Sequence, residues 1–286
     1  MGNRFDSFFS LGRQARFTIA LMMLGAVVTA LIGIMRFSGG MIDWQVESSW
    51  MLGGTLLLTV VALVHATSYW SFRKAFELLA CAFVISIPAE ALGTRVGLPH
   101  GASYHYHEAI GPRLFGTVPL FIPFAWFVLL YSPLLLLDLV QPCGRARLDP
   151  WIRIPFAALI IIASDLYLDP LAVESGAWTW GRTGSWFGVP FANFVGWGLV
   201  AILVYSAFFV LGAPPPTSSR EARWLRWTNF SAGGILGGAA LYCLGDRIEQ
   251  GWVALAAGAL LTLITLILWH FIGRIHQTHQ SQQVES

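Results

Sequence analysis

Residues 151–172 read WIRIPFAALIIIASDLYLDPLA. An apolar run of this length spans the hydrocarbon core of a bilayer as a helix, because ~20 residues suffice. Asp165 and Asp169 interrupt the run one helical turn apart. A carboxylate inside a membrane span is costly and is a functional candidate by default. This stretch therefore predicts a transmembrane helix and a site within it.

The composition of the whole chain agrees with a membrane location. Hydrophobic residues make up 56% of the chain and charged residues 11%, against roughly a quarter charged in a soluble domain. We therefore predict an integral membrane protein. The net charge of +2 is too small to indicate a nucleic-acid partner, and Cys81, Cys143 and Cys243 lie too far apart for a disulfide framework or a zinc site.

Apolar runs of similar length recur along the chain, and we expect a single membrane domain over residues 1–286. It is predicted as an all-α bundle of about eight transmembrane helices. Residues 17–212 form a six-helix part, 213–227 a linker, 228–272 two C-terminal helices and 273–286 a disordered tail. The expected spans are 17–35, 50–68, 75–92, 118–139, 151–172, 190–212, 228–245 and 251–272.

The orientation follows from the distribution of positive charge. With eight spans, the termini and the even-numbered loops contain most of the 17 Lys and Arg residues. Since cytoplasmic loops are enriched in these residues, both termini are predicted to be cytoplasmic, in a bacterial-type inner membrane. Loops 93–117 and 173–189 then share the outer side. Their Gly, Pro and aromatic content predicts ordered turns that form a lid over the bundle.

Three intramembrane carboxylates lie under this expected lid. At 1.5 Å per residue, Glu90 lies ~22 Å along the third span and Asp165 ~21 Å along the fifth, at similar depth. The alternative is that each carboxylate bonds to a neighbouring helix or to Arg95. Pro170, after Asp169, is expected to end or kink its helix.

Other charged residues are expected to have structural roles. Glu77 stands one turn from Arg73 and Lys74, which predicts a surface ion pair. Asp138 lies beside a basic cytoplasmic loop and needs no special role.

Two features of the sequence could indicate metal chemistry. The outer loop contains His100, His105 and His107, but the chain has only seven His, too few for the histidine boxes of membrane di-iron oxygenases. The Asp165-x-x-x-Asp169 motif is similar to the magnesium–diphosphate site of membrane prenyltransferases. Such a site needs a second Asp-rich motif, which the sequence lacks. We expect no metal site and no cofactor, and keep the prenyltransferase as an alternative.

Two segments resemble a known family. Residues 87–132 include IPAEALGTRVGLPHGASYHY, then Gly111-Pro112 and Ala125-Trp126, and residues 164–197 include SDLYLDP, Trp178-Thr-Trp180 and GVPFANFVGW. In this order they resemble the carotenoid biosynthesis membrane family, which includes bisanhydrobacterioruberin hydratase and the CruF-type carotenoid 1′-hydratases. The resemblance implies cofactor-independent addition of water to the terminal C1–C2 double bond of an acyclic carotenoid.

That chemistry fits the residues found from the sequence. Hydration needs a proton donor, a tertiary carbocation and a positioned water. We expect Glu90, Asp165 and Asp169 to be the acid–base set, with Asp165 as the acid and Glu90 as the base that activates water. The residues expected to bind substrate are His100, Tyr104, His105, Tyr106, Trp178, Trp180 and Asn193.

The expected partners are an acyclic carotenoid, the lipid bilayer and other carotenoid biosynthesis enzymes. Two alternatives to the hydratase remain. One is a magnesium-dependent prenyltransferase or carotenoid elongase. The other is a non-catalytic carotenoid-binding membrane protein, in which the acidic residues hold helices together.

Overall fold

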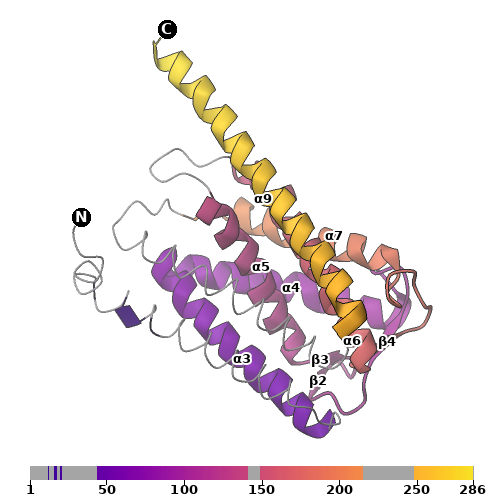
Figure 1. The fold of residues 1–286 in the computed structure, drawn as a ribbon. Coiled ribbons are helices and arrows are strands. Elements are labelled where there is room, and N and C mark those ends of the chain that lie inside the picture. The colour runs from indigo at the N-terminus through magenta and orange to yellow at the C-terminus, as the bar shows by residue number, and fades with distance from the viewer. Residues whose placement is uncertain are drawn as a thin grey trace.

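The computed structural model describes residues 44–140, 149–214 and 248–285, together with residues 12, 16, 17 and 20. Long helices make up most of the described chain (Figure 1). Their bounds are α3 (Trp44–Tyr69), α4 (Phe72–Val96), α5 (Phe121–Val140), α6 (Pro150–Ser175), α7 (Phe191–Val210) and α9 (Ile248–Glu285).

In the described part of the chain, six helices are long and apolar enough to cross a membrane. They coincide with the expected spans 50–68, 75–92, 118–139, 151–172, 190–212 and 251–272. The all-helical membrane fold is therefore confirmed. The expected span 228–245, and nearly all of the span 17–35 and of the linker 213–227, lie outside the described residues, so the count of eight is not confirmed.

The C-terminal segment differs from its prediction. Residues 273–286 were expected to be a disordered tail, whereas α9 continues to Glu285 and extends beyond the other helices in Figure 1. Extending an existing helix costs far less than nucleating one, and the Gln, Arg and Glu residues of this segment favour helix.

Helices α4 to α7 form the centre of the bundle. α4 packs against α5 and α7, and α6 packs against α5 and α7. α3 covers α4 and α5, and α9 lies against α6. The approach of α9 depends on Gly258, because a Cβ at that position would lie 2.4 Å from the carbonyl oxygen of Ala163 and 2.7 Å from the Tyr167 ring. Small residues permit such close helix packing in membranes.

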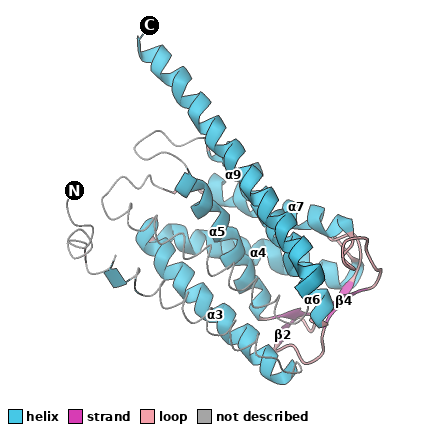
Figure 2. Ribbon diagram, viewed as in Figure 1, coloured by secondary structure: helices cyan, strands magenta, loops and turns pink. Residues whose placement is uncertain are grey.

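Two antiparallel ribbons lie at one end of the bundle, away from the C-terminus (Figure 2). β1 (Tyr104–Tyr106) pairs with β4 (Trp178–Trp180), with Tyr104 opposite Trp180 and Tyr106 opposite Trp178. β2 (Arg113–Leu114) pairs with β3 (Val118–Pro119). The expectation that loops 93–117 and 173–189 are ordered and share one end is confirmed. The strands themselves were not predicted.

Helix α6 passes through Pro170 and ends at Ser175, with Gly176 as a left-handed C-cap. Of the two outcomes expected at Pro170, an end or a kink, the end is therefore wrong. Proline has no N–H to donate to the carbonyl of Leu166, one turn earlier. The Trp186 indole Nε1–H from the outer loop donates to that carbonyl oxygen at 2.9 Å. A loop side chain thus satisfies the acceptor that the proline leaves open, and the helix continues.

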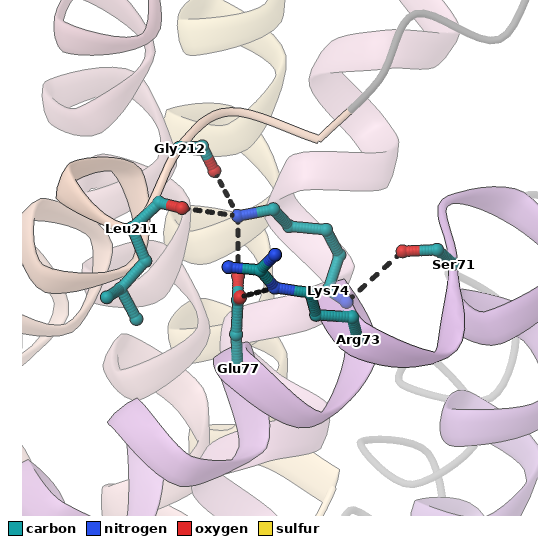
Figure 3. Close-up of polar contacts among 6 residues, drawn as sticks. All are labelled: Ser71, Arg73, Lys74, Glu77, Leu211 and Gly212. Carbon is teal, nitrogen blue, oxygen red and sulfur yellow. Dashed lines mark hydrogen bonds and ion pairs between the residues drawn. The ribbon is translucent and has the colours of Figure 1, made fainter.

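The opposite end of the bundle is held by ion pairs (Figure 3). Glu77 pairs with Arg73 at 2.7 Å and with Lys74 at 2.5 Å, as predicted. The Lys74 ammonium also donates to the carbonyl oxygens of Leu211 at 2.9 Å and Gly212 at 2.5 Å. It therefore ties the start of α4 to the end of α7, and is buried rather than on the surface.

Asp138, for which no role was predicted, also belongs to this end. It forms an ion pair with Arg153 at 2.7 Å and accepts a hydrogen bond from the Tyr69 hydroxyl at 3.2 Å. Because Asp138 and Arg153 are 2% and 3% exposed, this contact joins α3, α5 and α6 inside the bundle.

Candidate active site

Glu90 lies at the centre of a buried hydrogen-bonded cluster near the end of α4. Its Oε2 accepts hydrogen bonds from the hydroxyls of Tyr104 and, at 2.8 Å, Tyr106. Its Oε1 accepts one from the Trp126 indole at 2.7 Å. Three donors suit a carboxylate, which accepts hydrogen bonds and donates none. The structure therefore holds Glu90 in one position.

The β1 strand explains how both tyrosines reach Glu90. Alternate side chains of a strand point to opposite faces, so Tyr104 and Tyr106 face inward and His105 is exposed. Burial, and then the charge of Glu90, raise the pKa of both tyrosines well above the usual range, so both hydroxyls keep their protons. His105, which was predicted to bind substrate, does not lie in this cluster.

Tryptophans cover the cluster on two sides. Measured between ring centroids, Trp180 lies 4.9 Å from Tyr104, and Trp178 lies 5.6 Å from Tyr106. From α7, Trp197 packs on Trp126 at 4.6 Å. The carboxylate is thus surrounded by aromatic rings.

Asn193 joins the two aspartates of α6. Its Nδ2 donates to Asp165 Oδ2 at 2.8 Å and to Asp169 Oδ2 at 2.5 Å. The aspartates therefore share one helix face, as their spacing predicted. The three side chains are at most 2% exposed, so two carboxyl groups lie side by side out of solvent.

His100 connects the aspartates with the Glu90 cluster. Its Nδ1 lies 2.9 Å from Asn193 Oδ1, and its ring packs edge-on against Tyr104 at 5.6 Å. Gly196 makes room for it, because a Cβ there would lie 3.0 Å from His100 Nδ1. Burial lowers the pKa of His100, against the opposing effects of Glu90 and Asn193. The imidazole is therefore neutral at neutral pH.

The cations near the lid do not bond to these carboxylates. Arg95 donates to the carbonyl oxygen of Phe115 at 3.4 Å, and Arg113 to the carbonyl oxygens of Tyr106 and His107 at 3.2 and 2.7 Å. In the part of the chain that the structure describes, no Lys or Arg forms an ion pair with Glu90, Asp165 or Asp169. The Arg95 alternative therefore has no support in these contacts.

Sequence reasoning found most of this site but missed two tryptophans. Glu90, His100, Tyr104, Tyr106, Asp165, Asp169 and Asn193 lie in the two connected clusters, and Trp178 and Trp180 lie above them. Trp126 and Trp197 were not predicted as site residues. Both stand in segments that resemble the family, Ala125-Trp126 and GVPFANFVGW, and that resemblance is the signal that could have found them. Helical spacing alone does not distinguish an indole that bonds to a carboxylate from one that faces lipid.

The aspartate pair differs from a magnesium–diphosphate site in one respect. One oxygen of each aspartate, Oδ2, accepts a hydrogen bond from the Asn193 amide. Among the described residues, no group of three or more His, Cys, Asp or Glu is arranged to hold a metal ion.

Two comparisons with known proteins match this chain. The model of the family described as carotenoid biosynthesis protein matches residues 50–265. Bisanhydrobacterioruberin hydratase of Haloarcula japonica is 29% identical over 213 residues, which cover 72% of this chain and 68% of that protein. No solved structure matches the chain. These matches support a carotenoid-modifying role. Because the family model covers most of its length, the chain belongs to the carotenoid biosynthesis protein family.

Proposed function

We propose that this protein is a carotenoid hydratase, which adds water to the terminal C1–C2 double bond of an acyclic carotenoid end group by acid–base catalysis. The observation that carries the proposal is the buried Asp165–Asn193–Asp169 group beside the aromatic-lined Glu90. The hydratase named among its relatives gives the reaction class. The apolar helices suit a substrate that is dissolved in the bilayer.

Asp165 is the proton donor in this proposal. Two adjacent carboxyl groups that are out of water and lack a cation hold a proton between them more readily than both ionise. Asp165 Oδ1 is buried and has no hydrogen-bond partner among the described residues. A proton on Asp165 would pass to C2, and the positive charge would form on the tertiary carbon C1.

Glu90 and the aromatic rings stabilise that carbocation. The faces of Trp and Tyr attract a cation without forming a covalent bond to it. Glu90 adds a negative charge that is held in place before the reaction begins, and preorganised charge costs no rearrangement in the transition state. Its three hydrogen bonds favour this role over the water-activating role expected from the sequence.

The site contacts favour neither alternative function. A prenyltransferase would use the aspartate oxygens for magnesium, but one oxygen of each aspartate, Oδ2, is bonded to Asn193. A non-catalytic carotenoid-binding protein would use these carboxylates only to hold helices together, and Glu90–Trp126 and Asn193–Asp165 do join helices. Asp165 Oδ1 takes no part in these contacts and has no partner among the described residues, which a purely structural role does not explain.

The test is to express the chain in a host that makes lycopene. The expected product is a more polar pigment that is heavier by one water molecule and has an unchanged visible spectrum, because the end-group double bond lies outside the conjugated chain. Its oxygen should come from labelled water rather than from oxygen gas, and the activity should survive EDTA. Absence of any hydrated pigment, or loss of the activity with EDTA, would contradict the proposal.

A further inference from the structure

His100 is a buried side chain with one nitrogen engaged and one open. The residue is 1% exposed. Its Nδ1 contacts Asn193 Oδ1, while Nε2 is buried and has no hydrogen-bond partner among the described residues. A buried polar atom without a partner is rare in proteins and needs an explanation.

The hydrogen bonds fix which nitrogen carries the proton. The Asn193 amide nitrogen faces two carboxyl oxygens, at 2.8 and 2.5 Å, so Asn193 Oδ1 must face the imidazole. This oxygen can only accept, so His100 Nδ1 is the N–H donor. Nε2 of the neutral ring then presents an unprotonated lone pair.

We propose that His100 is the general base of the hydration, and that its Nε2 removes the proton from the water that attacks C1. This inference rests on the proposed function and assigns the residue that activates water. His100 is suited to the role because its lone pair is unused, whereas Glu90 is engaged by three donors. The amide group of Asn193 contacts both the base, His100, and the acid, Asp165, and so fixes their relative positions.

The proposed reaction adds one water across the C1=C2 bond. The π electrons of C1=C2 form a C2–H bond with the proton of Asp165, which leaves a carboxylate on Asp165 and a cation at C1. A lone pair of the water oxygen forms the C1–O bond. One O–H bond of that water breaks, and its proton moves to His100 Nε2. Before the next turnover the imidazolium loses one proton and Asp165 regains one, so the reaction consumes one water.

Two substitutions separate the base from its structural contact. His100→Asn retains an N–H donor near the position of Nδ1 and loses Nε2. His100→Gln places an amide oxygen near Nε2 that is far too weak a base. Both should lower hydration by about 10²- to 10⁴-fold, the usual contribution of a general base. His270→Asn, on α9 near Val140, is the matched control and should keep full activity.

Deuterium oxide provides a readout that a merely structural role would not give. With Asp165 intact and no base for water, the cation should form and collapse back to alkene. Carotenoid recovered from the two His100 variants should therefore carry deuterium at the end group, although it is not hydrated. In Asp165→Asn, neither deuterium nor hydration should appear.

Three results would overturn this assignment. Hydration within about threefold of the wild type in both variants would show that the base contribution expected of His100 is absent. Loss of hydration without deuterium uptake, in variants that elute and melt as the wild type does, would place His100 before cation formation. No hydration by the wild type on any acyclic carotenoid would overturn the proposed function itself, and this failure is visible without any variant.

Discussion

The two ends of the helical bundle use carboxylates in opposite ways. At the end shown in Figure 3, Glu77 pairs with Arg73 and Lys74, and deeper in the bundle Asp138 pairs with Arg153. Under the ribbons, the described partners of Glu90, Asp165 and Asp169 are neutral donors. Along α5, Trp126 and Asp138 are ~18 Å apart, and so are Asp165 and Arg153 along α6, at 1.5 Å per residue.

Burial alone therefore does not separate the carboxylates proposed to be catalytic from those that pair with cations. A carboxylate with a cation in contact is neutralised and joins helices. One whose partners are tyrosine, tryptophan and asparagine retains its own proton chemistry. The two classes can be separated by substitution, because removal of the first should affect folding and removal of the second should affect turnover.

The largest effect is expected from Asp165→Asn. The asparagine oxygen can still accept from Asn193, so the fold should be retained while the proton donor is lost. Hydration should fall by about 10²- to 10⁴-fold, with a melting temperature close to that of the wild type. The measurement is product formed per milligram of protein in membranes. Near-normal turnover would exclude Asp165 as the acid.

The matching change at the other end is Asp138→Asn. It leaves the Arg153 charge buried without its counter-charge, and breaking a buried pair in this way costs about 3–5 kcal/mol. The yield of folded protein and its melting temperature in detergent should fall, while the turnover of the molecules that remain folded should be nearly normal. A stable but inactive protein would mean that the two ends are not functionally distinct.

A smaller effect is expected where packing positions the site. A Cβ on Gly93 would lie 2.7 Å from the His100 ring and 2.8 Å from the Tyr104 ring. Gly93→Ala should displace both side chains, and a misplacement of about 1 Å can cost up to about 10²-fold in rate. Gly53→Ala is the control, because a Cβ there meets no atom within 4 Å. Equal rates in the two variants would show that the positions of His100 and Tyr104 do not matter.

The smallest effect concerns pH. Burial lowers the pKa of His100 below its usual value of 6.5. At a pH between the lowered value and 6.5, His100 therefore binds a proton in the unfolded chain but not in the folded protein. The His100 contribution to stability is complete above pH 6.5 and is lost as the pH falls toward the lowered value.

The wild type should therefore lose more thermal stability below pH 6.5 than His100→Gln does. The groups around the imidazole are Glu90 on α4, Asp165 and Asp169 on α6, and Tyr104 on β1. All of them are present in both proteins, so the difference between the two melting curves reports on His100. Parallel curves would mean that His100 is not held neutral.

The sequence by itself determined the membrane fold and the depth of the acidic residues. Hydrophobic runs located all six described helices, because a span must be apolar over ~20 residues whatever its neighbours. Counting along the helices placed Glu90 and Asp165 at similar depth, and their clusters meet at His100. Spacing also placed Asp165 and Asp169 on one face, because residues four apart are neighbours on any helix.

Only the tertiary structure decided which partner each residue has. Helical spacing does not reveal how α5 and α7 are rotated about their axes, so Trp126 and Trp197 were missed. Strand register turned His105 outward and Tyr104 and Tyr106 toward Glu90. The Trp186 contact that carries α6 past Pro170 joins segments from different parts of the chain. Length and polarity are properties of each segment, whereas hydrogen-bond partners depend on how the segments pack.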